Sequence, residues 1–178
     1  YTTLFRSGMQ MYEARYLDEL ILHCKKNGVL TIADEVMTGF GRTGKNFAIE
    51  YLQYKPDIIC LSKGITGGFL PLGVTVCSQK IFDAFYADDK MKTFFHGHSY
   101  TANPLACAAA NASMDILMSD NCQQQIQSVV SSHTLFANTV RNHPFVKDVR
   151  QQGTIIAIEL HTSESSSYFN SIQQAAYQ

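Results

Sequence analysis

Two apolar segments, each followed by a residue of opposite charge, constrain the fold of this chain more than any other feature. The first is Val29–Ala33, followed by Asp34, and the second is Ile58–Ser62, followed by Lys63. A helix-like segment before them and a long crossover between them favour parallel strands, because parallel neighbours cannot be joined by a tight turn. The sequence therefore predicts an α/β sheet in which Asp34 and Lys63 leave neighbouring strands at one edge, where such sheets bind ligands.

The remaining patterns predict helices around this sheet and a second unit after it. Leu17, Leu20, Ile21 and Cys24 have the spacing of an amphipathic helix, which Asn27-Gly28 ends. Further elements are expected in this order: a strand over 72–77, a short helix capped by Ser78, a helix from Asn103-Pro104 to about Met118, a helix over 121–141, strands over 146–150 and 154–160, and a helix over Tyr168–Gln178. The change of pattern near Met118 divides the chain into units over 1–118 and 119–178.

Composition excludes several classes of protein. The 178 residues are 46% hydrophobic and 16% charged with a net charge of −1, which is typical of a globular protein and gives no basic surface for nucleic acid. No stretch is apolar and long enough to span a bilayer, and the start of the chain lacks the features of a signal peptide. The five cysteines have no paired spacing, so we expect small buried side chains, no metal site and a cytosolic protein.

The amine of Lys63 and the carboxylate of Asp34 suit pyridoxal phosphate. A lysine forms a Schiff base with this cofactor, and a carboxylate beside the pyridine nitrogen keeps it protonated, so that the ring accepts carbanion electrons. The pair Gly67-Gly68 lets backbone approach a flat ligand closely. The alternative is a structural ion pair at the edge of the sheet.

The loop Gly39–Asn46 is close to a phosphate-binding P-loop. Asn46 stands where that motif has the hydroxyl that holds magnesium, and the loop does not follow its strand directly. Both departures disfavour nucleotide binding. Within the loop, Arg42 is either a ligand for a substrate carboxylate or a solvated side chain.

The segment His96-Gly97-His98 offers two histidines without further ligands at metal-binding spacing. Gly97, Ser99 and the residues after them come just before a predicted helix, and a helix N-terminus is a favourable place for a phosphate group. The alternative is a plain capping turn. Metal binding is not expected here.

Three blocks of the sequence resemble the class III aminotransferases, which use pyridoxal phosphate on the type I aminotransferase fold. The blocks are residues 32–44, 61–68 and 95–106. The resemblance implies that Lys63 is the catalytic lysine and that Asp34 is the partner of the pyridine nitrogen. It further implies that His98 and Ser99 belong to a segment that reaches the cofactor phosphate across a homodimer interface.

The resemblance also bears on the substrate. Cys60–Gly73 and Phe94–Ser99 are most similar to the members of the class that transfer an amino group to 8-amino-7-oxononanoate in biotin synthesis, with adenosylmethionine or lysine as the donor. In these members, positions matching Arg42 and Gly97 touch the substrate. The alternatives are a class III aminotransferase for an ω-amino acid or ornithine, and a protein without activity that only dimerises or binds partners.

Family members are much longer than this chain. The resemblance runs from about Gly8 to Leu160 and leaves out Tyr1–Ser7. We therefore expect an internal fragment, inactive alone, with part of the large cofactor-binding domain over 1–118 and part of the small α+β domain over 119–178.

Overall fold

The computed structural model describes residues 5–6 and 9–161. The helices and strands are β1 (Phe5–Arg6), β2 (Gln10–Met11), α1 (Ala14–Lys26), β3 (Ile32–Asp34), β4 (Ile58–Leu61), β5 (Val74–Cys77), α2 (Gln79–Phe85), α3 (Pro104–Met118), α4 (Asp120–Val140), β6 (Val146–Gln152) and β7 (Ile155–Leu160). The 3₁₀ helices that lie wholly within the described residues are η2 (Ala48–Tyr51), η3 (Lys63–Thr66) and η4 (Lys90–Lys92). The helix expected over Tyr168–Gln178 lies outside the described residues.

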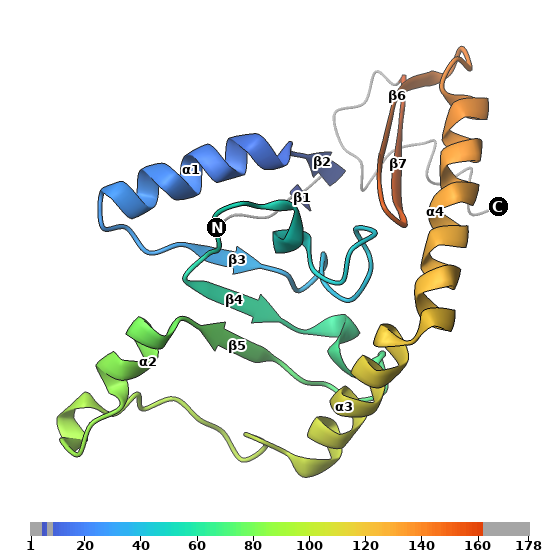
Figure 1. Ribbon diagram of the computed structural model, residues 1–178. Helices are drawn as coiled ribbons and strands as arrows, with labels where there is room; N and C mark the ends of the chain where they lie inside the picture. The colour runs from blue at the N-terminus through green and yellow to red at the C-terminus, as the bar shows by residue number, and fades with distance from the viewer. Residues whose placement is uncertain (1–4, 7–8, 162–178) are drawn as a thin grey trace.

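The central sheet has the order β3-β4-β5 (Figure 1). β3 and β4 are parallel, with Ile32 opposite Ile58 and Asp34 opposite Cys60, which confirms the predicted parallel pair. β5 follows from a short connection and runs antiparallel to β4, with Cys77 opposite Ile58. The mixed α/β fold therefore keeps the ends of β3 and β4 at one edge, as predicted.

The first strand is shorter than predicted and begins at Ile32 instead of Val29. Val29 and Leu30 are exposed, and Thr31, just before the strand, is held by the carboxylate of Asp57 in addition to backbone hydrogen bonds to its carbonyl. Asp57 Oδ2 accepts hydrogen bonds of 2.8 Å from both the backbone N–H and the hydroxyl of Thr31. Burial raises the pKa of Asp57, but the hydrogen bonds from Thr31 and the charges of Lys25 and Lys80 together outweigh it, so the pKa is lowered.

A hydrophobic cluster joins α1 to the β6–β7 hairpin. It consists of Leu17 and Ile21 from α1, Ala48 from η2, Leu52 just after η2, and Ile155 from β7. Burying a side chain such as Ile21 or Leu17 stabilises the fold by roughly 1.5–3 kcal/mol. Leu20, predicted on the same face of α1, is 46% exposed, because the cluster covers only part of that face. The β6–β7 hairpin is therefore packed against the first half of the chain.

The helices α3 and α4 meet at Ser119. The side chain of Asn103 caps α3 by accepting hydrogen bonds from the N–H groups of Leu105 and Ala106, as the Asn-Pro pair predicted. Ser119 caps α4 by accepting from Cys122 N. Ser78 precedes α2 as predicted, but its side chain makes no capping bond.

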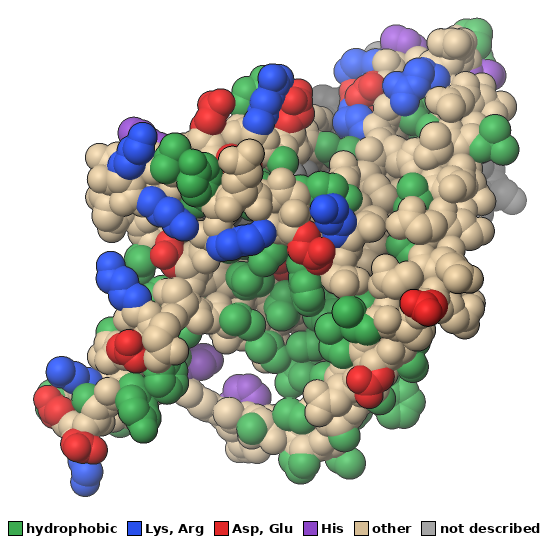
Figure 2. All heavy atoms as spheres, viewed as in Figure 1, with side chains coloured by type: hydrophobic (Ala, Val, Ile, Leu, Met, Phe, Trp, Pro, Cys, Tyr) green, Lys and Arg blue, Asp and Glu red, His purple; other side chains and the backbone are tan. Residues whose placement is uncertain are grey.

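The lower part of the molecule exposes many large apolar side chains (Figure 2). They come from the segment between β4 and the end of α3 and include Phe69, Tyr86, Met91, Phe95, Tyr100, Leu105 and Ile116. The expected burial of the cysteines is wrong here: Cys77 is exposed and the other four are half-buried. The physical reason for Cys77 is that β5 is an edge strand, and no described element pairs with its outer side.

None of the described helices combines the length and the apolar character needed to cross a membrane.

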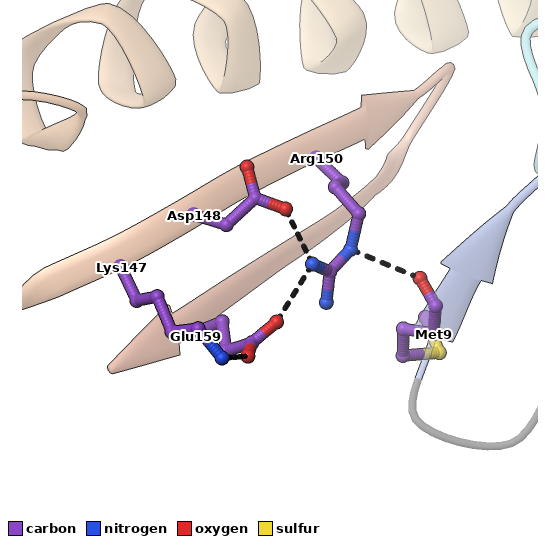
Figure 3. Close-up of polar contacts among 5 residues, drawn as sticks. All are labelled: Met9, Lys147, Asp148, Arg150 and Glu159. Carbon is purple, nitrogen blue, oxygen red and sulfur yellow. Dashed lines mark hydrogen bonds and ion pairs between the residues drawn. The ribbon is translucent and has the colours of Figure 1, made fainter. Parts of the chain in front are cut away.

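An ion-pair network joins the two strands of the hairpin (Figure 3). Glu159 on β7 contacts Lys147 Nζ at 2.6 Å and Arg150 Nη1 at 2.9 Å. Arg150 also contacts Asp148 and donates from Nε to the carbonyl of Met9 at 3.3 Å, which ties the hairpin to the segment before α1. The hydrogen bonds from Lys147 and Arg150 lower the pKa of Glu159 from 4.5 to about 2.

This network predicts an acid-sensitive hairpin. Because the folded chain lowers the pKa of Glu159, its stabilising effect is complete above pH 4.5 and is lost as the pH falls toward about 2. We expect the wild-type chain to lose more thermal stability over that interval than Glu159→Gln, and the difference to shrink in high salt because the side chain is partly exposed. Glu19→Gln, at an exposed position of α1, is the matched control and should follow the wild type. Parallel pH curves for the wild type and Glu159→Gln would contradict this.

Candidate active site

Asp34 and Lys63 emerge at the same edge of the parallel pair. Asp34 is the last residue of β3 and pairs with Cys60 of β4, and Lys63 begins η3 just after that strand ends. The N–H of Glu35 donates to the carbonyl of Cys60 at 2.9 Å, so the two chains are still held together where the charged residues leave them. The structure thus brings these two predicted site residues to one place in the fold.

The carboxylate of Asp34 is half-buried and oriented by the backbone. Its Oδ1 accepts a hydrogen bond of 3.0 Å from the N–H of Val36. Among the described residues, Oδ2 has no hydrogen-bond partner in the structure. An oriented carboxylate whose second oxygen accepts no hydrogen bond from the described residues is suited to accept one from a ligand.

Lys63 has a strained backbone. Its φ of +48° lies in the left-handed region, which costs a residue with a Cβ roughly 1–2 kcal/mol. Ser62 before it is extended, and its hydroxyl donates to the carbonyl of Leu72 at 2.8 Å, which holds the turn in place. Such strain persists where surrounding structure determines it, and it is concentrated at functional sites. The side chain of Lys63 is exposed.

The loop over 39–44 packs directly on the turn that carries Lys63. A Cβ on Gly64 would lie 2.9 Å from the Cβ of Phe40, so the two backbones approach closely only because position 64 has no side chain. Phe40 also contacts Phe47 edge-on, with ring centroids 5.4 Å apart. The lysine turn, the loop and the start of η2 therefore form one packed unit.

Glu35 is a structurally important residue that sequence reasoning missed. It is 1% exposed; its Oε1 accepts from the N–H of Ile49 at 2.7 Å and its Oε2 from the hydroxyl of Thr38 at 2.5 Å. Successive side chains of a strand point to opposite faces, so Glu35 enters the packed side while Asp34 faces the other. That alternation was the available signal. Glu35 therefore anchors the loop that packs on the turn carrying Lys63.

The loop does not form a phosphate cradle. The N–H of Gly41 donates to Asn46 O at 3.1 Å and that of Gly44 to Gly41 O at 3.0 Å, so these donors are used within the loop. The side chain of Asn46 accepts from Gln123 Nε2 at 3.1 Å and thereby anchors α4. Arg42 is exposed, and within the described residues its guanidinium has no hydrogen bond or ion pair.

Gly97, His98 and Ser99 lie in a turn before α3. His98 Nδ1 accepts from the N–H of Tyr100 at 3.1 Å, and the N–H of His98 donates to the hydroxyl of Thr101 at 2.9 Å. The side chain of Ser99 is exposed.

This turn precedes the start of α3, at the opposite end of the helix from Met118 (Figure 1). The part of α3 that contacts η3 is around Ser113, next to Gly67. About nine residues of helix, or roughly 14 Å, separate Ser113 from Pro104 at the start of α3. Within one chain, the structure does not bring His98 and Ser99 to Lys63.

Comparisons with known proteins agree with this geometry. The family described as aminotransferase class III matches residues 6–177. The adenosylmethionine-8-amino-7-oxononanoate aminotransferase of Synechococcus elongatus is 45% identical over 165 residues, which are 93% of this chain and 38% of the relative. The solved enzyme of that name from Methanocaldococcus jannaschii superposes with a TM-score of 0.78 at 40% identity, over 86% of this chain and 36% of the other. An ω-transaminase from Thermomicrobium roseum superposes with a TM-score of 0.79 at 32% identity, over 88% and 35%.

The chain spans between 35% and 38% of the length of these relatives. The match to the family description nevertheless covers almost all of the chain, including the three blocks singled out in the sequence. It also extends beyond the range from Gly8 to Leu160 that the sequence alone suggested. The edge with Asp34 and Lys63, the packed loop and the helical segment are all included. The chain belongs to the class III aminotransferase family.

Proposed function

We propose that this chain is the central part of a pyridoxal-phosphate-dependent transaminase, in which residues 1–118 belong to the large domain and 119–178 to the small domain. The full-length protein transfers an amino group from adenosylmethionine to 8-amino-7-oxononanoate, giving 7,8-diaminononanoate for biotin synthesis. The observation that carries the proposal is the common position of Asp34 and Lys63 at the end of two parallel strands. The identity with the relative from Synechococcus elongatus supports the choice of substrate.

The residues at this edge fit pyridoxal phosphate. Lys63 is exposed on a turn of fixed geometry, and Asp34 presents an oriented carboxylate from the neighbouring strand. Gly67 and Gly68, both with positive φ, follow without side chains that would crowd a flat ring. When bound, pyridoxal phosphate supplies an electron sink for the carbanion that forms when a substrate loses its Cα proton.

The two charged residues have separate tasks. The carboxylate of Asp34 would keep the pyridine nitrogen of bound pyridoxal phosphate protonated through a charge-assisted hydrogen bond. With the cofactor bound, the amine of Lys63 would hold it covalently before the substrate arrives and would then move the proton that the substrate Cα releases. Arg42, and Gly97 from a second copy of the chain, contact the amino-oxononanoate, with Arg42 as the partner of its carboxylate.

His98 and Ser99 act from a second copy of the chain. They lie away from Lys63 in their own chain, so a homodimer is needed to bring them to the cofactor phosphate of the other subunit. The exposed apolar side chains between Phe69 and Ile116 support this, because a surface of this kind is suited to a partner. The Ser99 hydroxyl and the backbone near the start of α3 supply the donors for the phosphate.

A comparison of substrates tests this function. The full-length protein is expected to use 8-amino-7-oxononanoate with a kcat/KM at least about a hundredfold above that for an ω-amino acid or ornithine, because its site pairs with the acceptor's own polar groups. Replacing adenosylmethionine by lysine as the donor should lower turnover. Preference for an ω-amino acid would support the second candidate, which the likeness to the Thermomicrobium roseum enzyme favours. Failure of the purified protein to bind pyridoxal phosphate would reject both.

A further inference from the structure

The tip of the β6–β7 hairpin holds the backbone of the loop that carries Arg42. Both the N–H and the hydroxyl of Thr154 donate to the carbonyl of Arg42 at 3.0 Å. The amide of Gln152 donates to the carbonyl of Thr43 at 3.3 Å. These contacts join residues more than a hundred positions apart in the sequence.

The approach of the two backbones is close. Gly153 has a φ of +59°, and a Cβ there would lie 2.1 Å from the carbonyl carbon of Thr43 and 2.2 Å from the nitrogen of Gly44. No side chain fits between the hairpin and the loop. From η2, the hydroxyl of Tyr51 donates to the same Thr43 carbonyl at 2.7 Å. The loop is therefore held by two elements, the hairpin and η2, just after Arg42.

We propose that Gln152–Thr154 is a positioning element for Arg42 and sets the affinity of the site for the carboxylate of the amino acceptor. The guanidinium of Arg42 is exposed, so its position is determined through its backbone. A displacement of about 1 Å in a group that orients a substrate is enough to weaken catalysis strongly. The inference rests on the proposed function, because the contact of Arg42 with substrate belongs to that proposal.

The first test needs no substrate and uses the 178-residue chain. Thr154→Val removes the hydroxyl bond to Arg42 but keeps the shape and the N–H bond. Loss of one hydrogen bond predicts that amide hydrogen exchange over residues 40–46 becomes roughly 2- to 10-fold faster. Thr154→Ser should exchange like the wild type. Thr139→Val is the matched control, since that exposed hydroxyl bonds only within α4. Exchange over 40–46 that is equal in Thr154→Val and Thr139→Val would overturn the proposal.

The second test uses the full-length protein and its kinetics. Thr154→Val should raise KM for the amino-oxononanoate about 3- to 10-fold with kcat within about twofold, the pattern of lost binding without lost chemistry. Thr154→Ser should restore KM, and the absorption of lysine-bound pyridoxal phosphate should be the same in all variants. A fall in kcat at unchanged KM would overturn the positioning role. If the wild type does not use this acceptor, the proposed function fails, and the exchange experiment still decides whether the hairpin holds the loop.

Discussion

Lys63→Ala in the full-length protein is expected to lower kcat by roughly 10⁴-fold, the scale of loss when a residue that moves the reacting proton is removed. The variant should still bind pyridoxal phosphate through Asp34, but without the covalent bond, so borohydride reduction should no longer fix the cofactor to the protein. Alanine keeps the Cβ, so the substitution leaves the backbone strain at φ +48° unchanged. Turnover measured with saturating acceptor and donor, together with mass spectrometry after reduction, checks both expectations.

Two controls separate this role from a structural one. Lys26→Ala removes an exposed lysine in the last turn of α1 and should leave kcat within about twofold of the wild type. In Lys63→Ala, a small added amine such as methylamine should restore part of the turnover, because it accepts the proton at the position of the missing Nζ. Full activity of Lys63→Ala, or borohydride labelling at another lysine, would reject the assignment.

The ends of the helices and the pairing of β3 with β4 could be predicted from nearby residues. The cap at Asn103, the end of α1 before Gly28 and the parallel pairing of β3 with β4 were predictable, because each depends on residues close in sequence or on a connection of known length. The direction of β5 was not predicted, since a short apolar run carries no information on which way it pairs. The common edge of Asp34 and Lys63 follows from the parallel pair, so this part of the site could be read from the sequence.

The contacts that hold the site were not predictable in the same way. Nothing in the pattern around Thr154 or Gly153 indicates that the hairpin tip meets the loop at Arg42, because the partners are far apart in sequence and linked mainly through backbone carbonyls. By its position next to Asp34, Glu35 resembles a second acidic residue of the candidate site. Its carboxylate instead accepts hydrogen bonds from the Thr38 hydroxyl and the Ile49 N–H. Residue types suggest which groups do chemistry, whereas the bonds that orient them depend on tertiary packing.

Because Asp34 and Glu35 point to opposite faces, only Asp34 is expected to act on the cofactor. The second large effect on activity is therefore expected for Asp34→Asn. The amide keeps an oxygen that accepts from Val36 N, so the backbone geometry at the end of β3 is retained. It carries no charge, however, and cannot hold a proton on the pyridine nitrogen, so we expect kcat to fall about 10²- to 10³-fold, as when one charge-stabilising group is removed from a site.

A chemically modified cofactor makes this test specific. Pyridoxal phosphate methylated at the ring nitrogen carries a permanent positive charge, so it should remove most of the difference between Asp34→Asn and the wild type. Asp115→Asn, at an exposed position of α3, is the matched control and should be active with the ordinary cofactor. If Asp34→Asn were as active as Asp115→Asn, or if the methylated cofactor restored nothing, the carboxylate would have no part in holding the ring proton, and the edge formed by β3 and β4 would lose its proposed role in electron withdrawal.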